Sequence, residues 1–385
     1  MVHTRAIETD QPPKLENPVE SIAELKAALK YCKNRGENHE VDYTGIEPSG
    51  GKKYIGGQGG IISNFLAETD SEVILYTPHL SSELVEMMNE KILYPVKEDG
   101  EFYLKNVQDA VNSDKTKRNH IFEFEGDRSG RLILSGRLKG YGPYLPKDIE
   151  KELSLIQENI DCCIMSGFHN VTGNKTAKLK RSGLQLAEID KPVHVEYVHK
   201  DDKTAELIAE YVIPEADSLG LDETEIREIA GILGLECPEE LNFGEAFSLI
   251  KKLLEELDLS RIHLHTYTYH ITVVEESYPV EPGKIRGSML YGELSAIQSA
   301  EKDGIPSKDD IRGFNMEDKR IQDLQELKDF GEFHSIEGFE EEGTAQVDGF
   351  KVVGIPIINH VDPARTVGMG DIISSGAFSM ESMNR

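Results

Sequence analysis

The sequence predicts an α/β protein whose mostly parallel sheet is covered by helices on both faces, together with a second, smaller sheet. From residue 148 onward, apolar strand-like runs alternate with amphipathic helical segments, which is the pattern of consecutive strand–helix units. Residues 101–136 instead hold short strand-like runs divided by turns, without helices between them, which predicts a small antiparallel sheet. The length of 385 residues suits two domains, or one large domain with an insertion.

The individual elements follow from the spacing of apolar residues. In the first half, residues 20–31, 61–68 and 81–91 have helical spacing, residues 50–60 are Gly-rich, and residues 72–78 form an apolar run typical of a buried strand. Further helices are expected at residues 148–159, 176–189, 202–213, 222–234, 243–257, 288–303, 317–330 and from 370 onward. Further strands are expected at residues 161–168, 192–199, 216–221, 261–274 and 350–358, the fourth of them as one long or two short strands.

The chain is predicted to divide into a body and a lid that interleave along the sequence. The lid takes residues 20–50 and 100–140, and the body takes residues 51–99 and 141–385. Residues 1–19 are polar, contain prolines and lack periodicity, so we expect an irregular N-terminus.

The charge of the chain excludes several classes of partner. Asp and Glu number 70 against 42 Lys and Arg, which gives a net charge of −28. This argues against nucleic acid and against an anionic membrane surface as partners, and no apolar run approaches the roughly 20 residues that span a bilayer. A phosphate substrate would need a local anion site. The four cysteines have no paired spacing, which is typical of a reducing compartment and predicts a cytoplasmic protein.

A Gly-x-Gly-Asp turn that leads into a helical segment is the sharpest local feature. Backbone N–H groups at a helix start attract an anion, and Gly368 and Gly370 would let a phosphate approach closely because they lack a β-carbon. Asp371 would stand in the first turn, where it can take a proton from a substrate hydroxyl. The local pattern alone favours a simpler alternative, in which Asp371 only caps the helix.

Two further acidic positions are candidates for a magnesium site. On a strand, His194 and Glu196 point to the same face, and a carboxylate at the carboxyl end of a parallel strand is well placed to hold Mg²⁺. Glu225 follows Asp222 by three residues at a predicted helix start, which makes it a second Mg²⁺ candidate. Taken alone, a solvated strand end explains the first pattern, and a capping box explains the second.

Histidines and tyrosines alternate within residues 261–274. His263, His265, Tyr267 and Tyr269 would share one face of a single long strand. Zinc is not favoured, because no acidic or Cys third ligand lies near in the sequence. Packing of the rings, or contact with a nucleotide, fits better.

Five segments occur together and in order: Ile55–Asn64, Val73–Pro78, His194–Glu196, Asp217–Glu225 and Thr366–Asp371. In this combination, over about residues 20–380, the chain resembles the archaeal ADP-dependent sugar kinases, a family of ADP-dependent glucokinases and phosphofructokinases with a ribokinase-like fold. The resemblance implies a three-layer body with a mostly parallel sheet and a small α/β lid that closes over the sugar and excludes water.

The resemblance also implies a role for each candidate residue. Asp371 would be the catalytic base, and Gly368 and Gly370 would form an anion hole for the transferred phosphoryl group. Mg²⁺ would be held, directly or through water, by Glu196, Glu225 and Asp371. Sugar contacts are implied for Glu40, Gly57 and Gln58, and nucleotide contacts for His265, Thr266, His360 and Val361.

The chain departs from the family pattern in two places. Family members begin with a buried strand that carries an Asn-x-Asn-x-Asp-like segment, whose Asp grips sugar hydroxyls. No such segment precedes residue 20 here, so we expect weak or no activity for the chain as it stands, and an in-frame upstream extension that encodes the strand. Family members also often have Asn before Arg-Phe-Ile in the lid, whereas Gly130 precedes Arg131 here, which puts one sugar contact in question.

The implied function is phosphoryl transfer. We expect an ADP-dependent kinase of glycolysis that moves the β-phosphate of ADP to a sugar hydroxyl with Mg²⁺ and leaves AMP, with fructose 6-phosphate as the first substrate and glucose as the second. The alternative is a non-catalytic sugar- or nucleotide-binding protein on the same scaffold. The Gly-x-Gly-Asp, His-x-Glu and Asp-Glu-Thr-Glu segments favour the enzyme, because a binding protein does not need a base and metal partners together.

Overall fold

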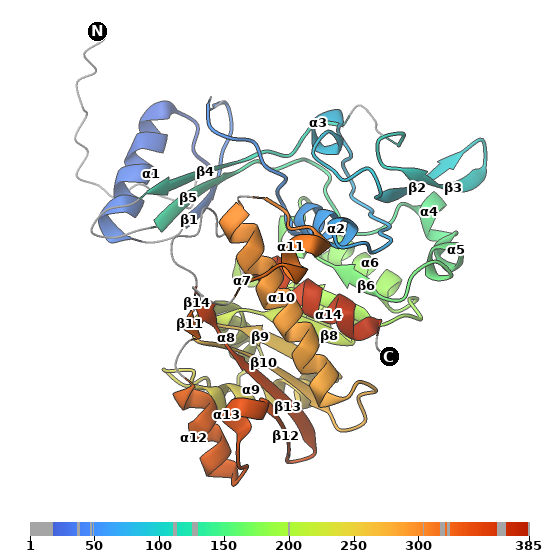
Figure 1. Cartoon of the computed structure of the whole chain (residues 1–385). Coiled ribbons are helices and arrows are strands. Elements are labelled where there is room, and N and C mark those ends of the chain that lie inside the picture. Colours follow the sequence, from blue (N-terminus) through green and yellow to red (C-terminus); the bar gives the residue numbers. More distant parts are fainter. Residues whose placement is uncertain are drawn as a thin grey trace. The chain divides into compact units, whose positions relative to one another are not determined.

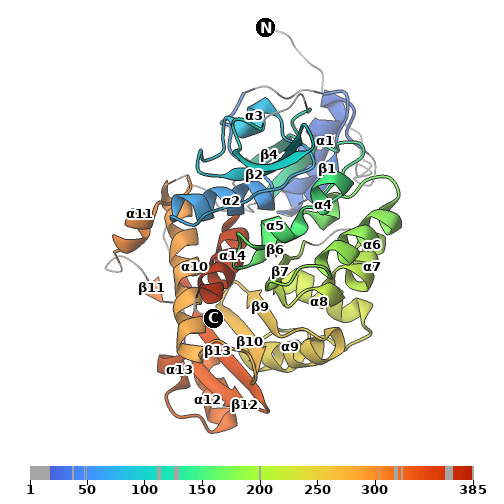
Figure 2. The ribbon, with the colours of Figure 1, turned by 90° about the vertical axis from the view of Figure 1, so that its right-hand side faces the viewer.

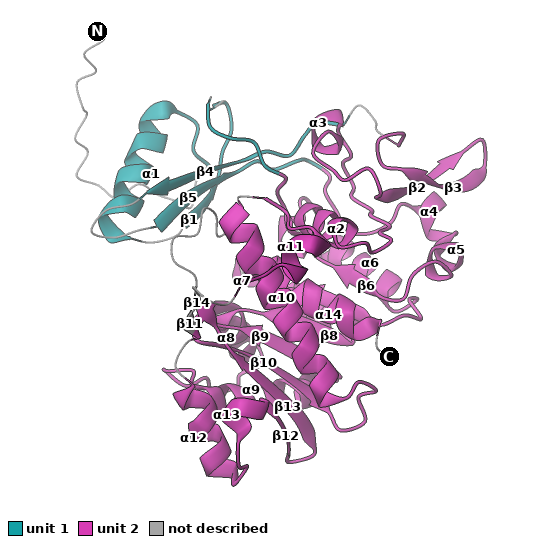
Figure 3. Cartoon of the chain, in the orientation of Figure 1, with its two compact units in different colours: residues 1–54, 114–139 teal, residues 55–113, 140–385 magenta. Residues whose placement is uncertain are grey.

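The chain divides into two compact units. The computed structural model describes residues 18–36, 39–46, 48, 50–110, 114–124, 130–198, 201–302, 304–315, 320–321, 324–359 and 367–383. Unit 1 consists of residues 1–54 and 114–139, and unit 2 of residues 55–113 and 140–385, so each unit is made of two stretches of sequence (Figure 3). Residues 100–110, predicted to belong to the lid, instead pack within unit 2.

Unit 1 is a helix on a small three-stranded sheet. Its elements are α1 (Ile22–Arg35), β1 (His39–Asp42), β4 (Asn119–Phe124) and β5 (Gly130–Ser135), in the strand order β1-β5-β4. β1 runs parallel to β5, and β4 runs antiparallel to it. α1 begins with a capping box, in which Ser21 and Glu24 satisfy each other's backbone N–H groups. Leu25 and Ala28 of α1 are buried in one apolar cluster with Leu132 and Leu134 of β5, so the helix covers the sheet through its apolar side.

A seven-stranded sheet forms the centre of unit 2 (Figure 1). Its order is β12 (Thr344–Val347), β13 (Phe350–Pro356), β10 (Tyr269–Glu275), β9 (Arg261–His265), β8 (Ser218–Leu221), β7 (Val193–Glu196) and β6 (Cys163–Met165). The four strands β6, β7, β8 and β9 are mutually parallel, whereas β9–β10, β10–β13 and β13–β12 are antiparallel pairs. The parallel half brings the carboxyl ends of four strands to one edge of the sheet.

The apolar run 261–274 forms two strands joined by a tight turn. The Thr266 hydroxyl accepts the N–H of Tyr269 at 3.0 Å and donates to its carbonyl at 2.7 Å, which closes the turn. Tyr267 lies in that turn and is 84 % exposed, whereas Tyr269 is buried in β10. The predicted alternation of four rings on one strand face is therefore wrong beyond His265.

The helices of unit 2 lie on both faces of the sheet (Figures 1 and 2). Their bounds are α2 (Gln58–Glu68), α3 (Ser82–Val85), α4 (Lys147–Glu150), α5 (Leu153–Gln157), α6 (Lys175–Leu186), α7 (Asp202–Tyr211), α8 (Glu223–Ile232), α9 (Phe243–Leu257), α10 (Pro282–Lys302), α11 (Lys308–Arg312), α12 (Gln325–His334), α13 (Phe339–Glu342) and α14 (Met369–Ser382), with 3₁₀ turns at Phe168–Asn170 and Ile213–Glu215. Among the described residues, no helix is long and apolar enough to cross a membrane.

The short strands between residues 72 and 136 do not form one sheet. β2 (Leu93–Glu98) and β3 (Glu101–Asn106) pair as a hairpin in unit 2, whereas β4 and β5 belong to the sheet of unit 1. The strand predicted at residues 72–78 is reduced to one isolated bridge between Ile74 and Leu93. A second small pair, β11 (Arg320–Ile321) with β14 (Ile358–Asn359), completes the strands of the described residues.

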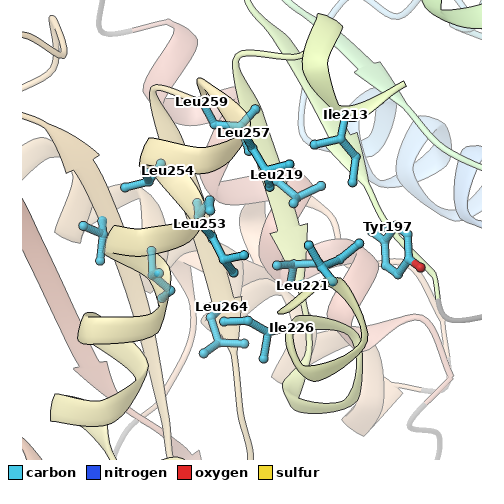
Figure 4. Close-up of a cluster of buried hydrophobic side chains, with 14 of the residues drawn as sticks. Tyr197, Ile213, Leu219, Leu221, Ile226, Leu253, Leu254, Leu257, Leu259 and Leu264 are labelled. Atoms are coloured by element: carbon cyan, nitrogen blue, oxygen red, sulfur yellow. The ribbon is translucent and has the colours of Figure 1, made fainter. Parts of the chain in front are cut away.

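One face of the large sheet is apolar. Leucines of α9, namely Leu253, Leu254 and Leu257, pack in one cluster with Leu219 of β8 and Leu264 of β9 (Figure 4). Each is nearly or fully buried, and burying such a side chain stabilises the fold by about 1.5–3 kcal/mol. This face fixes the strands against α8 and α9.

The opposite face of the same sheet, under α10 and α14, carries buried polar side chains. The Arg261 guanidinium of β9 forms two parallel hydrogen bonds with Glu381 of α14, at 2.9 and 2.7 Å, and both side chains are fully buried. His270 of β10 contacts Glu293 of α10 through Nε2 at 2.8 Å. These pairs join the two helices to the strands by specific bonds, so they determine where α14 begins relative to the sheet edge.

Candidate functional site

The N-terminus of α14 holds three of the predicted site residues. Gly368 caps the helix with φ = +84°, a left-handed conformation that glycine adopts without the steric cost of a β-carbon. A β-carbon on Gly370 would lie 2.6 Å from His265 Nε2, so only glycine fits beneath that ring. Asp371 follows in the first turn, beside the N–H groups that have no partner within the helix. This turn can bind an anion and carries a carboxylate beside it.

Asp371 is held by Gln58 of α2. The Gln58 Oε1 accepts the backbone N–H of Gly167 at 3.2 Å, and the Gln58 side chain hydrogen-bonds the Asp371 carboxylate. Burial raises the pKa of Asp371 to about 6, although the bond from Gln58 lowers it. Asp371 is therefore mostly ionised at neutral pH, yet it is a stronger base than an ordinary carboxylate.

Glu196 is the last residue of β7, at the carboxyl end of the parallel strands, and is 3 % exposed. His194 Nε2 lies 3.1 Å from its Oε2, and Ser374 of α14 also hydrogen-bonds it. Burial raises the pKa of Glu196 well above its ordinary value, and the negative charges of Asp371 and Glu225 raise it further. Burial and the charge of Arg261 hold the pKa of His194 well below its ordinary value, so the ring is neutral.

Glu225 belongs to the capping box of α8 that the sequence indicates. Its Oε2 accepts the Asp222 N–H at 2.8 Å, while Asp222 Oδ1 accepts the N–H groups of Thr224 and Glu225 at the same distance. The side chain is 7 % exposed, and it also lines the cavity described next. Glu225 can therefore cap α8 and also belong to the site, because the cap sets the direction in which its side chain points.

A cavity of about 220 Å³ lies where these elements meet, within unit 2. It is lined by Gln58, Glu196, Tyr197, Val198, Asp222, Glu225, His265, Gly368, Gly370 and Asp371. Seven of the predicted site residues are therefore gathered here, although they come from five different elements. A larger hollow of about 720 Å³ lies between α9 and α12, and none of the predicted residues lines it.

Several predicted residues lie outside the cavity lining. Gly57 precedes α2 but does not line the cavity, and the Thr266 hydroxyl is used in the turn between β9 and β10. Glu40 lies in unit 1, where Arg137 donates to it at 2.9 Å. His360 and Val361 fall outside the described residues.

The histidines of β9 and β10 pack against one another, as the sequence analysis expects for their rings. The ring centroids of His263, His265 and His270 are 6.1–6.4 Å apart. Burial, together with the charge of His270, lowers the pKa of His265 to about 4. The His265 ring at the cavity is therefore neutral at pH 7.

The carboxylates of the cavity suit a magnesium ion. Glu196, Glu225 and Asp371 present hard oxygen donors, and a cation would relieve the repulsion by Asp371 and Glu225 that adds to burial in raising the pKa of Glu196. In the described part of the chain, no three His, Cys, Asp or Glu side chains lie close enough to hold an ion by themselves. Mg²⁺ usually keeps several water ligands, so these residues fit an ion held partly through water.

The residues behind the cavity are not among those predicted from the sequence. Ser374, Ser218, Arg261 and Glu381 connect to His194 and Glu196 without lining the cavity. One signal was available. Arg261 is the first residue of the run predicted as strand, Glu381 lies in the predicted C-terminal helix, and a charge that becomes buried on such an element requires a partner.

This combination of fold and site defines a ribokinase-like kinase. Its features are a sheet covered on both faces, an acidic cavity at the carboxyl ends of the parallel strands, and an Asp beside an anion-binding helix start. The conserved region of the ADP-specific phosphofructokinases and glucokinases matches residues 2–380, and the chain belongs to this family.

The relatives cover nearly the whole chain. An ADP-specific phosphofructokinase of Pyrococcus horikoshii is 30 % identical, over 96 % of this chain and 88 % of its own length. An ADP-dependent glucose/glucosamine kinase of Pyrococcus furiosus is 29 % identical, over 95 % of this chain and 85 % of its own. Among solved structures, an ADP-dependent kinase in complex with fructose-6-phosphate and ADPβS has a TM-score of 0.83, with 28 % identity over 95 % of this chain and 89 % of its own.

The contact between Gln58 and Asp371 predicts a change in pH dependence. The bond stabilises the ionised carboxylate, so the substitution Gln58→Leu is expected to raise the pKa of Asp371 above about 6. With Asp371 as the proposed base, which must be ionised, activity is lost as the pH falls through this pKa. The acidic limb of kcat/KM should therefore move to higher pH in the variant.

The matched control is Gln157→Leu. Gln157 is a buried glutamine that bonds Glu188 and Asp190, outside the cavity lining. Its substitution should leave the acidic limb where it is. An unmoved limb in Gln58→Leu would contradict the assignment of Asp371 as the titrating base.

Proposed function

We propose that this protein is an ADP-dependent sugar kinase that transfers the β-phosphoryl group of ADP to a sugar hydroxyl and leaves AMP. The observation that carries the proposal is the meeting, in one cavity, of Asp371 at the start of α14 with Glu196 at the end of β7 and Glu225 at the start of α8. We propose fructose 6-phosphate as the first acceptor and glucose as the second. We further propose that the enzyme requires Mg²⁺ and acts in the cytoplasm.

Asp371 acts as the general base in this proposal. A pKa near 6 lets the carboxylate accept the proton of the sugar hydroxyl as the oxygen–phosphorus bond forms, while most of it remains ionised at neutral pH. The bond from Gln58 fixes its orientation. Correct placement of a base relative to the attacking oxygen is a large part of catalysis in phosphoryl transfer.

The start of α14 stabilises the transferred group. Its first N–H groups and the positive end of the helix dipole face the place where negative charge develops, and Gly368 and Gly370 leave the backbone open there. A net charge of −28 makes such a local site necessary, because the field of the whole chain repels a nucleotide.

Mg²⁺ would be held by Glu196, Glu225 and Asp371, in part through water. When bound, it neutralises phosphate charge. The side chains that hold it are fixed by independent bonds, Glu196 by His194 and Glu225 by the cap of α8.

The remaining predicted residues contribute binding. In our proposal, Glu40, Gly57 and Gln58 contact the sugar, and His265, Thr266, His360 and Val361 flank the nucleotide. Unit 1 acts as the lid that closes over the sugar and excludes water, which otherwise competes as the acceptor. Relatives named ADP-specific phosphofructokinase, and the related complex with fructose-6-phosphate, support fructose 6-phosphate as the first acceptor.

The direct test is a coupled assay with ADP or ATP as donor and fructose 6-phosphate or glucose as acceptor. AMP should form with ADP, depend on the sugar, and disappear when EDTA removes the divalent cation. Calorimetry in parallel would show nucleotide binding. Binding of ADP without AMP formation for either sugar, also in the N-terminally extended form, would favour a non-catalytic binding protein instead.

The second test removes the base. Asp371→Asn should lower kcat by about 10²–10⁴-fold while leaving ADP affinity within a small factor, because the amide keeps the size of the side chain. The control Asp348→Asn changes an exposed carboxylate on a turn and should leave kcat unchanged. Full activity of Asp371→Asn would refute the mechanism.

The third test concerns acceptor choice. Glu40→Gln should lower kcat/KM for glucose by about 10- to 100-fold, the cost of losing a charged hydrogen bond, and should affect fructose 6-phosphate less. Arg137 binds both Glu40 and Asp42, at 2.9 and 2.7 Å, so Asp42→Asn is the matched control. An equal effect of both substitutions would mean that Glu40 acts by holding Arg137 rather than by contacting sugar.

A further inference from the structure

A continuous chain of buried hydrogen bonds runs from the C-terminal part of α14 to the cavity. Glu381 accepts two bonds from the Arg261 guanidinium, and Arg261 Nη1 lies 3.0 Å from Ser218 Oγ. Ser218 Oγ lies 2.8 Å from His194 Nδ1. His194 Nε2 then lies 3.1 Å from Glu196 Oε2. Every one of these side chains is 3 % exposed or less, so water does not compete for the bonds.

Chemistry fixes one direction in this series of hydrogen bonds. A guanidinium can only donate, so Ser218 Oγ accepts from Arg261. The Ser218 hydroxyl keeps one proton of its own, which it can donate to Nδ1 of His194. Nδ1 is then without a proton, and the ring proton stands on Nε2, where it points at the Glu196 carboxylate. The opposite tautomer would set a bare nitrogen lone pair against that carboxylate.

We propose that Glu381, Arg261 and Ser218 fix His194 as an Nε2–H donor, and that this donor orients the Glu196 carboxylate toward the cavity. These four are positioning residues, since none of them lines the cavity. The inference rests on the proposed function in one respect, the assignment of Glu196 to the divalent cation. Residues behind a metal ligand orient it in this way in many metal sites.

The packing around His194 leaves the ring one position. It stacks on Phe378 of α14, with the ring centroids 4.8 Å apart. Gly220 lies beside Nε2, where a β-carbon would collide with Glu196 and Ser374 and would lie 3.0 Å from His194 Nε2. The ring is therefore closely packed both at its face and at Nε2.

The same series of hydrogen bonds connects Glu196, the proposed metal ligand, to α14, the helix that carries Asp371. Ser374 and Glu381 are both on α14, and Ser374 Oγ lies 3.0 Å from His194 Nε2. Two points of α14, about two turns apart, are thus bonded to β7, β8 and β9. Any shift of α14 along the sheet would break these hydrogen bonds. They therefore hold Glu196 and Asp371 in fixed positions relative to each other.

The first experiment reads the tautomer directly in metal-free, substrate-free protein. Histidine labelled with ¹⁵N is observed by long-range ¹H–¹⁵N NMR at pH 7.5, and the signals of His194 are those missing from His194→Gln. We expect a proton on Nε2 and none on Nδ1. A wild-type ring that carries a proton on Nδ1 would overturn the proposal, whether or not any variant folds.

The second experiment measures Mn²⁺ affinity in the presence of ADP by electron paramagnetic resonance. Ser218→Ala should weaken Mn²⁺ binding by about 10–100-fold, and the NMR spectrum should show His194 with a proton on Nδ1 in part of the molecules. The control Ser295→Ala removes an equally buried hydroxyl that bonds only within α10, and should change neither readout. Equal Mn²⁺ affinity in Ser218→Ala and Ser295→Ala would overturn the proposal.

A pair of substitutions at His194 separates positioning from packing. The amide of His194→Gln can place an N–H near the position of Nε2, and should retain most of the Mn²⁺ affinity. His194→Leu fills the same space but has no hydrogen-bond donor, so it should weaken Mn²⁺ binding by as much as Ser218→Ala does. Equal losses in both would mean that the ring acts by packing alone, which is against the proposal.

Failure of this inference is distinguishable from failure of the proposed function. If neither the chain nor its N-terminally extended form makes AMP, the function is wrong, but the NMR result still decides the tautomer. If the wild type is active and Ser218→Ala binds Mn²⁺ normally, the function stands and the positioning chain is wrong.

Discussion

The buried ion pair between Arg261 and Glu381 is the interaction on which the arrangement of the site depends. Both side chains are fully excluded from solvent, and the carboxylate raises the pKa of Arg261 above its ordinary value although burial opposes the charge. Removing one partner of such a pair costs about 3–5 kcal/mol, because an uncompensated charge stays buried. The pair therefore holds α14 on β9 in one register, and α14 carries Asp371 at its other end.

The two faces of the large sheet have different tasks. The face against α8 and α9 is apolar, and non-directional burial of leucines fixes the strands there. The face against α10 and α14 uses directional bonds, which cost more to bury but allow fewer alternative arrangements. Directional bonds hold the three carboxylates of the cavity in place, whereas apolar packing alone would let α14 slide along the sheet.

The sequence was sufficient for the strand–helix architecture of unit 2 and for seven of the ten residues that line the cavity. Periodicity located the strand–helix units, and the Gly-x-Gly-Asp turn located the start of α14. Prediction from the sequence was wrong for the features that depend on tertiary contacts. The apolar run at residues 72–78 forms only a single bridge, and the turn at Thr266 interrupts what looked like one strand. Arg261 and Glu381 are 120 residues apart, and no local pattern pairs them.

Glu225 shows why local patterns could not decide between a structural and a functional role. The capping box is present, and one oxygen of Glu225 completes it. The cap also fixes the Glu225 side chain at the start of α8, where it lines the cavity. The conformational entropy that Glu225 would lose on holding a cation is therefore already lost when the protein folds. Glu196 is placed in the same way, because bonds between Arg261 and Ser218 and between Ser218 and His194 hold the ring that contacts it. In this site structural bonds place the carboxylates that line the cavity, so the capping role of Glu225 and its proposed role at the metal are compatible.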